Sequence, residues 1–271
     1  MSVLDRMREQ WDAIATRNAF YGVVSWPEFQ ALDRIDREKF WATGRREVDE
    51  FLSRLNLGDT KSWSMVEIGC GLGRMTHRFA ERFSRVYSVD VSPEMLKRAG
   101  AQWASLANVD FILGHGNDLP GIADRSVDFV FSFIVLQHVP EPTIVKDYIR
   151  ETARVLRPGG LAYLQFRTDV LPPPFTPPSF AFRVFRAATH PRRALRTAIT
   201  RLRAHVFSLG ATEPPLDRKL ADDFDRFESW RGCALRAEEV EPFALSLGLC
   251  TENVTGVETQ YTFYTFRRVE A

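Results

Sequence analysis

An apolar run that ends in three alternating glycines constrains this chain more than any other stretch. Residues 65–73 read Met-Val-Glu-Ile-Gly-Cys-Gly-Leu-Gly, which predicts a buried strand, a glycine turn and then a helix over 75–83. Glycine permits positive φ and has no Cβ, so Gly69, Gly71 and Gly73 can let the backbone approach a ligand. The amides opening the next helix would face that ligand with the positive helix end behind them. The stretch predicts a nucleotide-type binding turn, with a plain packing turn as the alternative.

A carboxylate at the end of the next strand supports the ligand-binding interpretation. Residues 85–90 predict a second strand ending in Asp90, which lies 21 positions after Gly69. In dinucleotide folds an acid about 20 positions after the glycine turn binds a ribose. Those folds place a third glycine where this chain has Arg74. The spacing therefore favours a nucleoside ligand over a dinucleotide.

Three segments together resemble a known family. Residues 66–73 (Val-Glu-Ile-Gly-Cys-Gly-Leu-Gly), 89–96 (Val-Asp-Val-Ser-Pro-Glu-Met-Leu) and 154–160 (Arg-Val-Leu-Arg-Pro-Gly-Gly) are similar to class I S-adenosylmethionine-dependent methyltransferases of the small-molecule, type 11-like group. The resemblance covers roughly residues 63–166 and, more loosely, 238–268. It implies a Rossmann-like, doubly wound α/β fold with a mostly parallel seven-stranded sheet, helices on both faces and an antiparallel last strand.

The resemblance also implies a set of cofactor contacts for S-adenosyl-L-methionine. The three glycines would approach its methionine part, Glu67 would orient the loop or the amine, and Asp90 would hold the ribose. Met95, which follows the helix cap Ser92, would lie near the adenine, although core packing alone also explains it. The remaining candidate cofactor contacts are Cys70, Val91, Gly116, Asn117, Asp118, Phe133 and Tyr21.

The segment after the third strand departs from the family pattern. The third strand is predicted over 109–113, and His115 stands where the family usually has an Asp that meets the adenine amino group. His115, Gly116 or Asn117 could serve that edge instead. The adenine contact therefore stays open at this point.

Residues 1–57 are predicted to form an N-terminal helical cap. A short helix is expected to precede the aromatic segment 19–26, and residues 28–57 read as helical with a break near Gly44. In the family such a segment folds over the cofactor or acceptor as a lid, with Tyr21 as the candidate lid residue. The alternative is that Phe20 and Tyr21 only pack on the core.

His138 is the candidate catalytic base. The near-continuous apolar run 126–136 predicts a central fourth strand, and His138 follows its carboxyl end, where open α/β sheets bind ligands. Histidine titrates near neutral pH and can accept a proton from a hydroxyl. Two alternatives stay open: the residue holds the loop through a backbone bond, or it is a metal ligand.

The rest of the chain divides around an insertion. Residues 58–167 are predicted as the cofactor-binding core, which ends in a fifth strand over 161–166, and 236–271 as a final helix and hairpin. Between them, residues 168–235 form a Pro- and Arg-rich helical insertion. A lid over the acceptor is the functional interpretation. A solvated helix docked on the core is the alternative, and membrane-surface contact is the least favoured.

Composition excludes several classes of protein. The chain has 271 residues, 45% of them apolar, and a formal net charge of +1, so no nucleic-acid partner is indicated. Its three cysteines are far apart, which argues against disulfides or zinc and suits a reducing cytoplasm. We expect no signal peptide, and the longest apolar run, 129–136, is too short to span a bilayer.

These observations lead to a functional hypothesis. We expect methyl transfer from S-adenosyl-L-methionine to a small-molecule hydroxyl, with a sugar or saccharide as the favoured acceptor. The alternatives are N- or carboxyl-methylation of another metabolite or lipid, and a non-catalytic methyltransferase-like binding subunit. Magnesium (Mg²⁺) is an open option, with Asp or Glu ligands that the sequence does not select. The oligomeric state is not indicated.

Overall fold

The computed structural model describes residues 1–169 and 218–270. The helices in this part are α1 (Val3–Val23), η1 (Pro27–Phe29), η2 (Leu32–Arg34), α2 (Arg37–Leu55), α3 (Thr76–Ala80), α4 (Pro93–Gln102), η3 (Leu136–His138), α5 (Pro142–Val155), α8 (Arg218–Asp225), α9 (Glu228–Arg231) and α10 (Ala237–Ser246). The strands are β1 (Ser64–Ile68), β2 (Arg85–Asp90), β3 (Val109–Leu113), β4 (Val127–Ser132), β5 (Leu156–Phe166), β6 (Leu249–Thr255) and β7 (Thr262–Arg268).

The strands of the described residues form one seven-stranded sheet in the order β3-β2-β1-β4-β5-β7-β6. Strands β1 to β5 pair in parallel, and β7 pairs antiparallel with both β5 and β6. The order changes direction between β1 and β4, so the carboxyl ends of these two strands flank the crevice where such sheets bind ligands. The predicted Rossmann-like α/β fold is confirmed.

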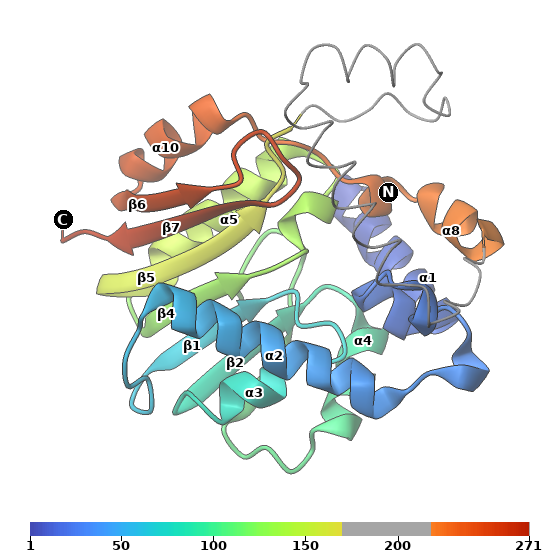
Figure 1. The fold of residues 1–271 in the computed structure, drawn as a ribbon. Helices are drawn as coiled ribbons and strands as arrows, with labels where there is room; N and C mark the ends of the chain where they lie inside the picture. Colours follow the sequence, from blue (N-terminus) through green and yellow to red (C-terminus); the bar gives the residue numbers. More distant parts are fainter. Residues whose placement is uncertain (170–217, 271) are drawn as a thin grey trace, which may run out of the picture. The chain divides into compact units, whose positions relative to one another are not determined.

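Alternating side chains divide the core into two layers. Met65, Phe129 and Phe131 face the layer of α2 and α3, whereas Val66 and Val130 face the layer of α5 and α10. Helices of both layers are visible on either side of the sheet in Figure 1. Because the central strands are apolar on both faces, their sequences read as continuous hydrophobic runs.

Several elements differ from the predicted ones: β5 begins at Leu156 instead of residue 161, α3 covers only Thr76–Ala80, and β4 and α2 differ as well. Strand β4 ends at Ser132, four residues before the predicted end, because Ile134 has φ of +55° and leaves the strand conformation. Helix α2 continues through Gly44 instead of breaking there. A Cβ at Gly44 would lie 2.0 Å from the backbone oxygen of Arg74, so this glycine permits close packing rather than ending the helix.

The N-terminal helix is longer than predicted and carries a kink. Helix α1 extends to Val23, with Asn18 at φ −160° and ψ 89° inside it. The Asn18 side-chain amide donates to the carbonyls of Phe29 (2.9 Å) and Gln30 (2.8 Å) and accepts from the amide of Tyr21. These bonds replace helical ones and join the kink to the η1 segment.

Hydrogen bonds of Asp12 join the middle of α1 to the start of α4. The Oδ1 atom of Asp12 accepts from Ser92 Oγ at 2.8 Å and from the Glu94 amide at 2.9 Å. Asp12 therefore satisfies an amide at the start of α4 that would otherwise lack a partner.

Of the predicted insertion, residues 170–217 lie outside the described residues. Within the described ones, no helix combines the length and apolarity needed to span a membrane.

Candidate functional site

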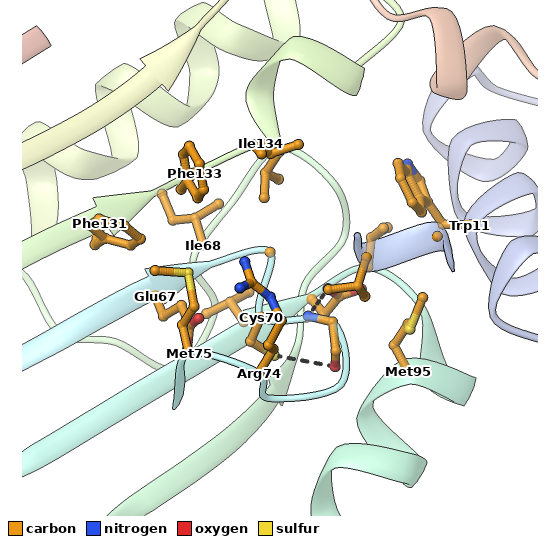
Figure 2. A pocket seen from close by; sticks show the side chains of 18 of the residues that line it. Trp11, Glu67, Ile68, Cys70, Arg74, Met75, Met95, Phe131, Phe133 and Ile134 are labelled. Atoms are coloured by element: carbon orange, nitrogen blue, oxygen red, sulfur yellow. Dashed lines mark hydrogen bonds between the residues drawn. The ribbon is translucent and has the colours of Figure 1, made fainter. Parts of the chain in front are cut away.

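A cavity lies at the carboxyl ends of β1, β2 and β4. It holds about 920 Å³ of empty space, including its solvent-open mouth. Figure 2 shows Phe133 and Ile134, which follow β4, on one side of the glycine turn and Met95 of α4 on the other. Trp11 of α1 completes the wall. The wall consists of Met7, Trp11, Gly22, Val23, Glu67, Ile68, Gly69, Cys70, Gly71, Arg74, Met75, Val89, Asp90, Val91, Met95, Phe131, Phe133, Ile134, Val135, Val139 and Tyr148.

The glycine turn is shaped by its conformation and by its protein neighbours. Gly69, Gly71 and Gly73 have φ of +73°, +54° and +74°, a region that side chains disfavour. A Cβ on each would also approach a side chain of Val135, Val23 or Trp103 to within 2.9 Å. The glycines were expected to leave room for a ligand, but side chains of the protein itself occupy the space next to their Cα atoms. Gly69 and Gly71 still line the cavity with their backbone, while Gly73 does not.

Asp90 holds the turn from the neighbouring strand. Its Oδ2 accepts from the Gly71 amide at 2.8 Å, and its Oδ1 accepts from the Ser92 amide at 2.9 Å. Burial raises the pKa of Asp90, and these amides oppose that rise. An ionised carboxylate accepts up to about four hydrogen bonds, so Asp90, which lines the cavity, can accept a further bond from a ligand. The arrangement fits a ribose diol.

Glu67 is a buried carboxylate in the cavity wall. Its Oε2 accepts from Thr76 Oγ1 at 2.5 Å and from Ser88 Oγ at 3.3 Å. Burial raises the pKa of Glu67 to about 7, although both hydroxyls stabilise the ionised form. A carboxyl that titrates near neutral pH can accept a bond from an ammonium group and lose its proton as it does so.

Arg74 brings a buried cation to the same wall. Its guanidinium donates to Thr43 Oγ1 at 3.0 Å and lies 2.7 Å from Glu47 Oε2, so α2 balances its charge. Close packing of α2 at Gly44 places these partners next to the glycine turn.

Burial, together with the neighbouring carboxylates, raises the pKa of the Cys70 thiol well above its usual value, so this thiol is un-ionised at neutral pH.

Ile134 is strained where it meets the cavity. A β-branched residue with φ of +55° is a conformational outlier. Such backbone strain costs about 1–3 kcal/mol and persists only where the surroundings impose it. The Ile134 amide donates to Oε1 of Gln165 at 2.7 Å, and Gln165 is fully buried on β5.

Several predicted cofactor residues do not line the cavity. Tyr21 packs with Ile14 and Phe224, while its neighbours Gly22 and Val23 form the wall. Gly116, at φ +106°, packs against Met7. The side chains after it are paired within the protein: Asn117 with Asp147 (3.1 Å), and Asp118 with the amide and Nδ1 of His115 (2.9 and 2.6 Å).

His138 is bonded on both sides of its ring. Nδ1 donates to the Trp230 carbonyl at 2.7 Å, and Nε2 lies 3.1 Å from the amide nitrogen of Gln137. The ring also stacks on Trp230 and meets Trp11 edge-on. Burial lowers the pKa of His138 to about 4, and the residue does not line the cavity. These contacts favour the alternative in which His138 holds its loop.

The metal expectation has no support in the described ranges 1–169 and 218–270. No group of three or more His, Cys, Asp or Glu side chains there is arranged to hold a metal ion. Two acidic residues that line the cavity have other partners: Glu67 accepts hydrogen bonds from hydroxyls, and Asp90 accepts them from backbone amides.

Sequence reasoning missed part of the wall. Arg74 directly follows the glycine turn, so its position was a usable signal. Tyr148 lies on the buried face of α5, where burial raises the pKa of its phenol, and its spacing resembles that of ordinary core residues. Met7 and Trp11 carry no motif, because only the fold of α1 over the sheet brings them to the cavity.

Comparison with known proteins agrees with this geometry. Residues 66–164 match the family model described as "Methyltransferase domain". This range runs from β1 to β5 and contains the glycine turn, Asp90 and the strained turn after β4.

The relatives differ in their reactions. The ubiquinone biosynthesis O-methyltransferase of Xanthomonas oryzae pv. oryzae is 31% identical over 52% of this chain and 54% of its own length. A thiol S-methyltransferase of Mus musculus is 30% identical over 51% of this chain and 56% of its own. The magnesium protoporphyrin IX methyltransferase of Synechocystis PCC 6803, solved with bound SAH, has a TM-score of 0.50 at 17% identity, covering 86% of this chain and 87% of that one. The chain spans about half the length of the curated relatives it matches.

Proposed function

We propose that this chain, whose domain belongs to the class I S-adenosylmethionine-dependent methyltransferases, transfers a methyl group from S-adenosyl-L-methionine to a hydroxyl oxygen of a small molecule. The observation that carries the proposal is the joint position of Asp90, Glu67 and the glycine turn in one cavity at the strand ends. S-adenosyl-L-methionine would supply the methyl group from its sulfonium: the oxygen–methyl bond forms as the sulfur–methyl bond breaks, and the neutral thioether S-adenosylhomocysteine leaves.

The residues of the chain would bind and align the reactants. Asp90 would accept hydrogen bonds from the ribose hydroxyls, and Glu67 would accept one from the ammonium group of the cofactor. Alignment is the main contribution needed, since a well-oriented pair of reactants gains about 7–11 kcal/mol over free encounter. The buried, un-ionised Cys70 thiol adds no competing nucleophile.

An apolar acceptor suits the wall beyond the glycine turn. Trp11, Phe133 and Ile134 line this side, and a saccharide would require hydrogen-bonding groups there. A phenolic hydroxyl ionises near pH 10, like that of tyrosine, and so depends less on a strong base than an aliphatic hydroxyl does. Since both ring nitrogens of His138 are engaged, we favour an aromatic hydroxyl over the saccharide expected from sequence.

A labelled-methyl assay tests this function. Purified protein would be incubated with methyl-labelled S-adenosyl-L-methionine and a phenol, a methyl hexoside, an alkyl thiol or a carboxylic acid, each with Mg²⁺ or with EDTA. We expect label in the phenol in both conditions, reduced transfer at low cofactor concentration in Asp90→Ala, and normal transfer in Asp110→Ala. Asp110 is a matched control because it lies on β3 and pairs with Arg85 outside the cavity. Cofactor binding without transfer to any acceptor would instead favour a non-catalytic binding subunit.

A further inference from the structure

A buried glutamine on β5 connects the strained turn to η3 and to the segment that precedes β7. Gln165 accepts from the Ile134 amide through Oε1. Its amide nitrogen donates to Gln137 Oε1 at 2.9 Å and to the Gln260 carbonyl at 2.5 Å. Both amide hydrogens and the carbonyl oxygen of this fully buried side chain are therefore used.

Backbone groups at both ends set the direction of the hydrogen bonds in this network: the Ile134 amide can only donate, and the carbonyls of Gln260 and Trp230 can only accept. The Trp230 carbonyl can only accept, so His138 Nδ1 carries the proton and Nε2 is left as an acceptor. The Gln137 amide nitrogen then donates to His138 Nε2, which turns Gln137 Oε1 toward Gln165. The network thus has one consistent orientation from Trp230 to Ile134.

The network ends at the part of the wall that touches the glycine turn. Phe133, Ile134 and Val135 all line the cavity. A Cβ placed on Gly69 would lie 2.3 Å from a methyl of Val135, so the two loops are in direct contact. A change in the backbone conformation of Ile134 would change the position of Val135, the next residue, relative to Gly69.

We propose that Gln165 is a positioning residue, which holds Ile134 in its strained conformation and thereby fixes the acceptor-side wall against the glycine turn. The catalytic part of this inference rests on the proposed methyl transfer, whereas the conformational part does not. Gln165 does not line the cavity, so it would act through the Ile134 amide.

A double-mutant cycle tests the conformational part. Gln165→Met keeps the length of the side chain and removes its hydrogen bonds, and Ile134→Gly removes the conformational strain. We expect amide hydrogen exchange over residues 131–139 to be at least about tenfold faster in Gln165→Met. In the Ile134→Gly background, the same substitution should change that exchange far less, because glycine does not need to be held.

Thr262→Val is the matched control. Thr262 is fully buried on β7, and its hydroxyl bonds to Thr168 and to the Gly256 carbonyl without contacting Ile134. We expect it to lower the melting temperature and to leave exchange over 131–139 unchanged. Unchanged exchange in Gln165→Met would overturn the proposal, as would an equal effect of that substitution in both backgrounds. Should Gln165→Met not fold, Gln137→Met breaks the next bond and must raise the same exchange.

Kinetics tests the catalytic part. A misplaced wall should lower kcat by about 100-fold in Gln165→Met, with the dissociation constant of S-adenosylhomocysteine, measured by calorimetry, changed less than about tenfold. Equal losses of kcat and cofactor affinity would mean that Gln165 only supports the fold. If the wild-type protein methylates no acceptor, the proposed function fails, and the exchange cycle still decides whether Gln165 holds the turn.

Discussion

Gly69 and Val135 are in direct contact across the cavity: a Cβ added to the glycine would lie 2.3 Å from Cγ2 of the valine and 2.5 Å from Cγ1. The contact joins the turn after β1 to the turn after β4. A side chain added at Gly69 would therefore collide with the turn after β4.

Gly69→Ala should therefore destabilise the protein and weaken cofactor binding. Its φ of +73° would strain any side chain, at a cost of about 1–3 kcal/mol, and the clash with Val135 adds to it. In the double variant with Val135→Ala, the protein should regain the part of its stability that the clash removes. The control is Gly100→Ala in α4, where a Cβ meets nothing within 4 Å, and there we expect a gain of about 0.5–1 kcal/mol. Thermal unfolding and calorimetry measure both effects, and equal responses at the two glycines would contradict this reading.

Glu67 should make the stability of the free protein fall with rising pH. Its pKa is about 7 in the fold against an ordinary value of 4.5, so between these values the folded protein retains a proton that the unfolded chain has lost. The stability present below pH 4.5 is lost as pH rises through 7, by up to about 3 kcal/mol. Glu67→Gln should remove this dependence between pH 5 and 8. Glu81→Gln is the control, because the pKa of Glu81 is about 2 and lies outside that window.

The same carboxyl should release a proton when cofactor binds near neutral pH. An ammonium group beside Glu67 favours its ionised form, which lowers the pKa of the carboxyl. Calorimetry of S-adenosylhomocysteine at pH 7 in buffers of different ionisation enthalpy would measure the release. We expect it in the wild-type protein and not in Glu67→Gln. Binding heats that do not depend on the buffer would place the ammonium group away from Glu67.

His138 should behave as a holding residue. Its pKa is about 4 in the fold against an ordinary value of 6.5, so its contribution to stability is complete above pH 6.5 and is lost as pH falls toward 4, by up to about 3 kcal/mol. His138→Asn keeps a donor for the Trp230 carbonyl. It should flatten this pH dependence and retain kcat within about tenfold. A loss of about 10²–10⁴ in kcat at unchanged melting temperature would restore the catalytic-base hypothesis.

Strand positions were predictable because they depend on local apolar patterns. The strands over 85–90 and 109–113 have the predicted bounds, and the glycine turn and Asp90 lie at the predicted strand ends. The apolar run through 136 gave no sign that β4 ends at Ser132. The turn at Ile134 is imposed by Gln165, 31 residues further along the chain, and no local pattern records such a bond.

The sequence likewise predicted some residues of the candidate site and not others. Glu67, Gly69, Asp90 and Met95 line the cavity, and their spacing along one β-α-β unit made them visible in the sequence. Tyr21 was chosen for its aromatic neighbourhood, yet it is Val23, two residues further along, that faces the cavity. The kink at Asn18 sets the direction of that segment, through side-chain bonds to a distant backbone.

Calorimetry with S-adenosylhomocysteine measures whether the cavity beside Asp90 binds S-adenosyl-L-methionine. We predict saturable binding to the wild-type protein and to Asp110→Ala. Asp90→Ala should bind more weakly by about 1–3 kcal/mol, the cost of losing bonds to a charged group. No binding by the wild-type protein, or equal affinity in a folded Asp90→Ala variant, would contradict the account.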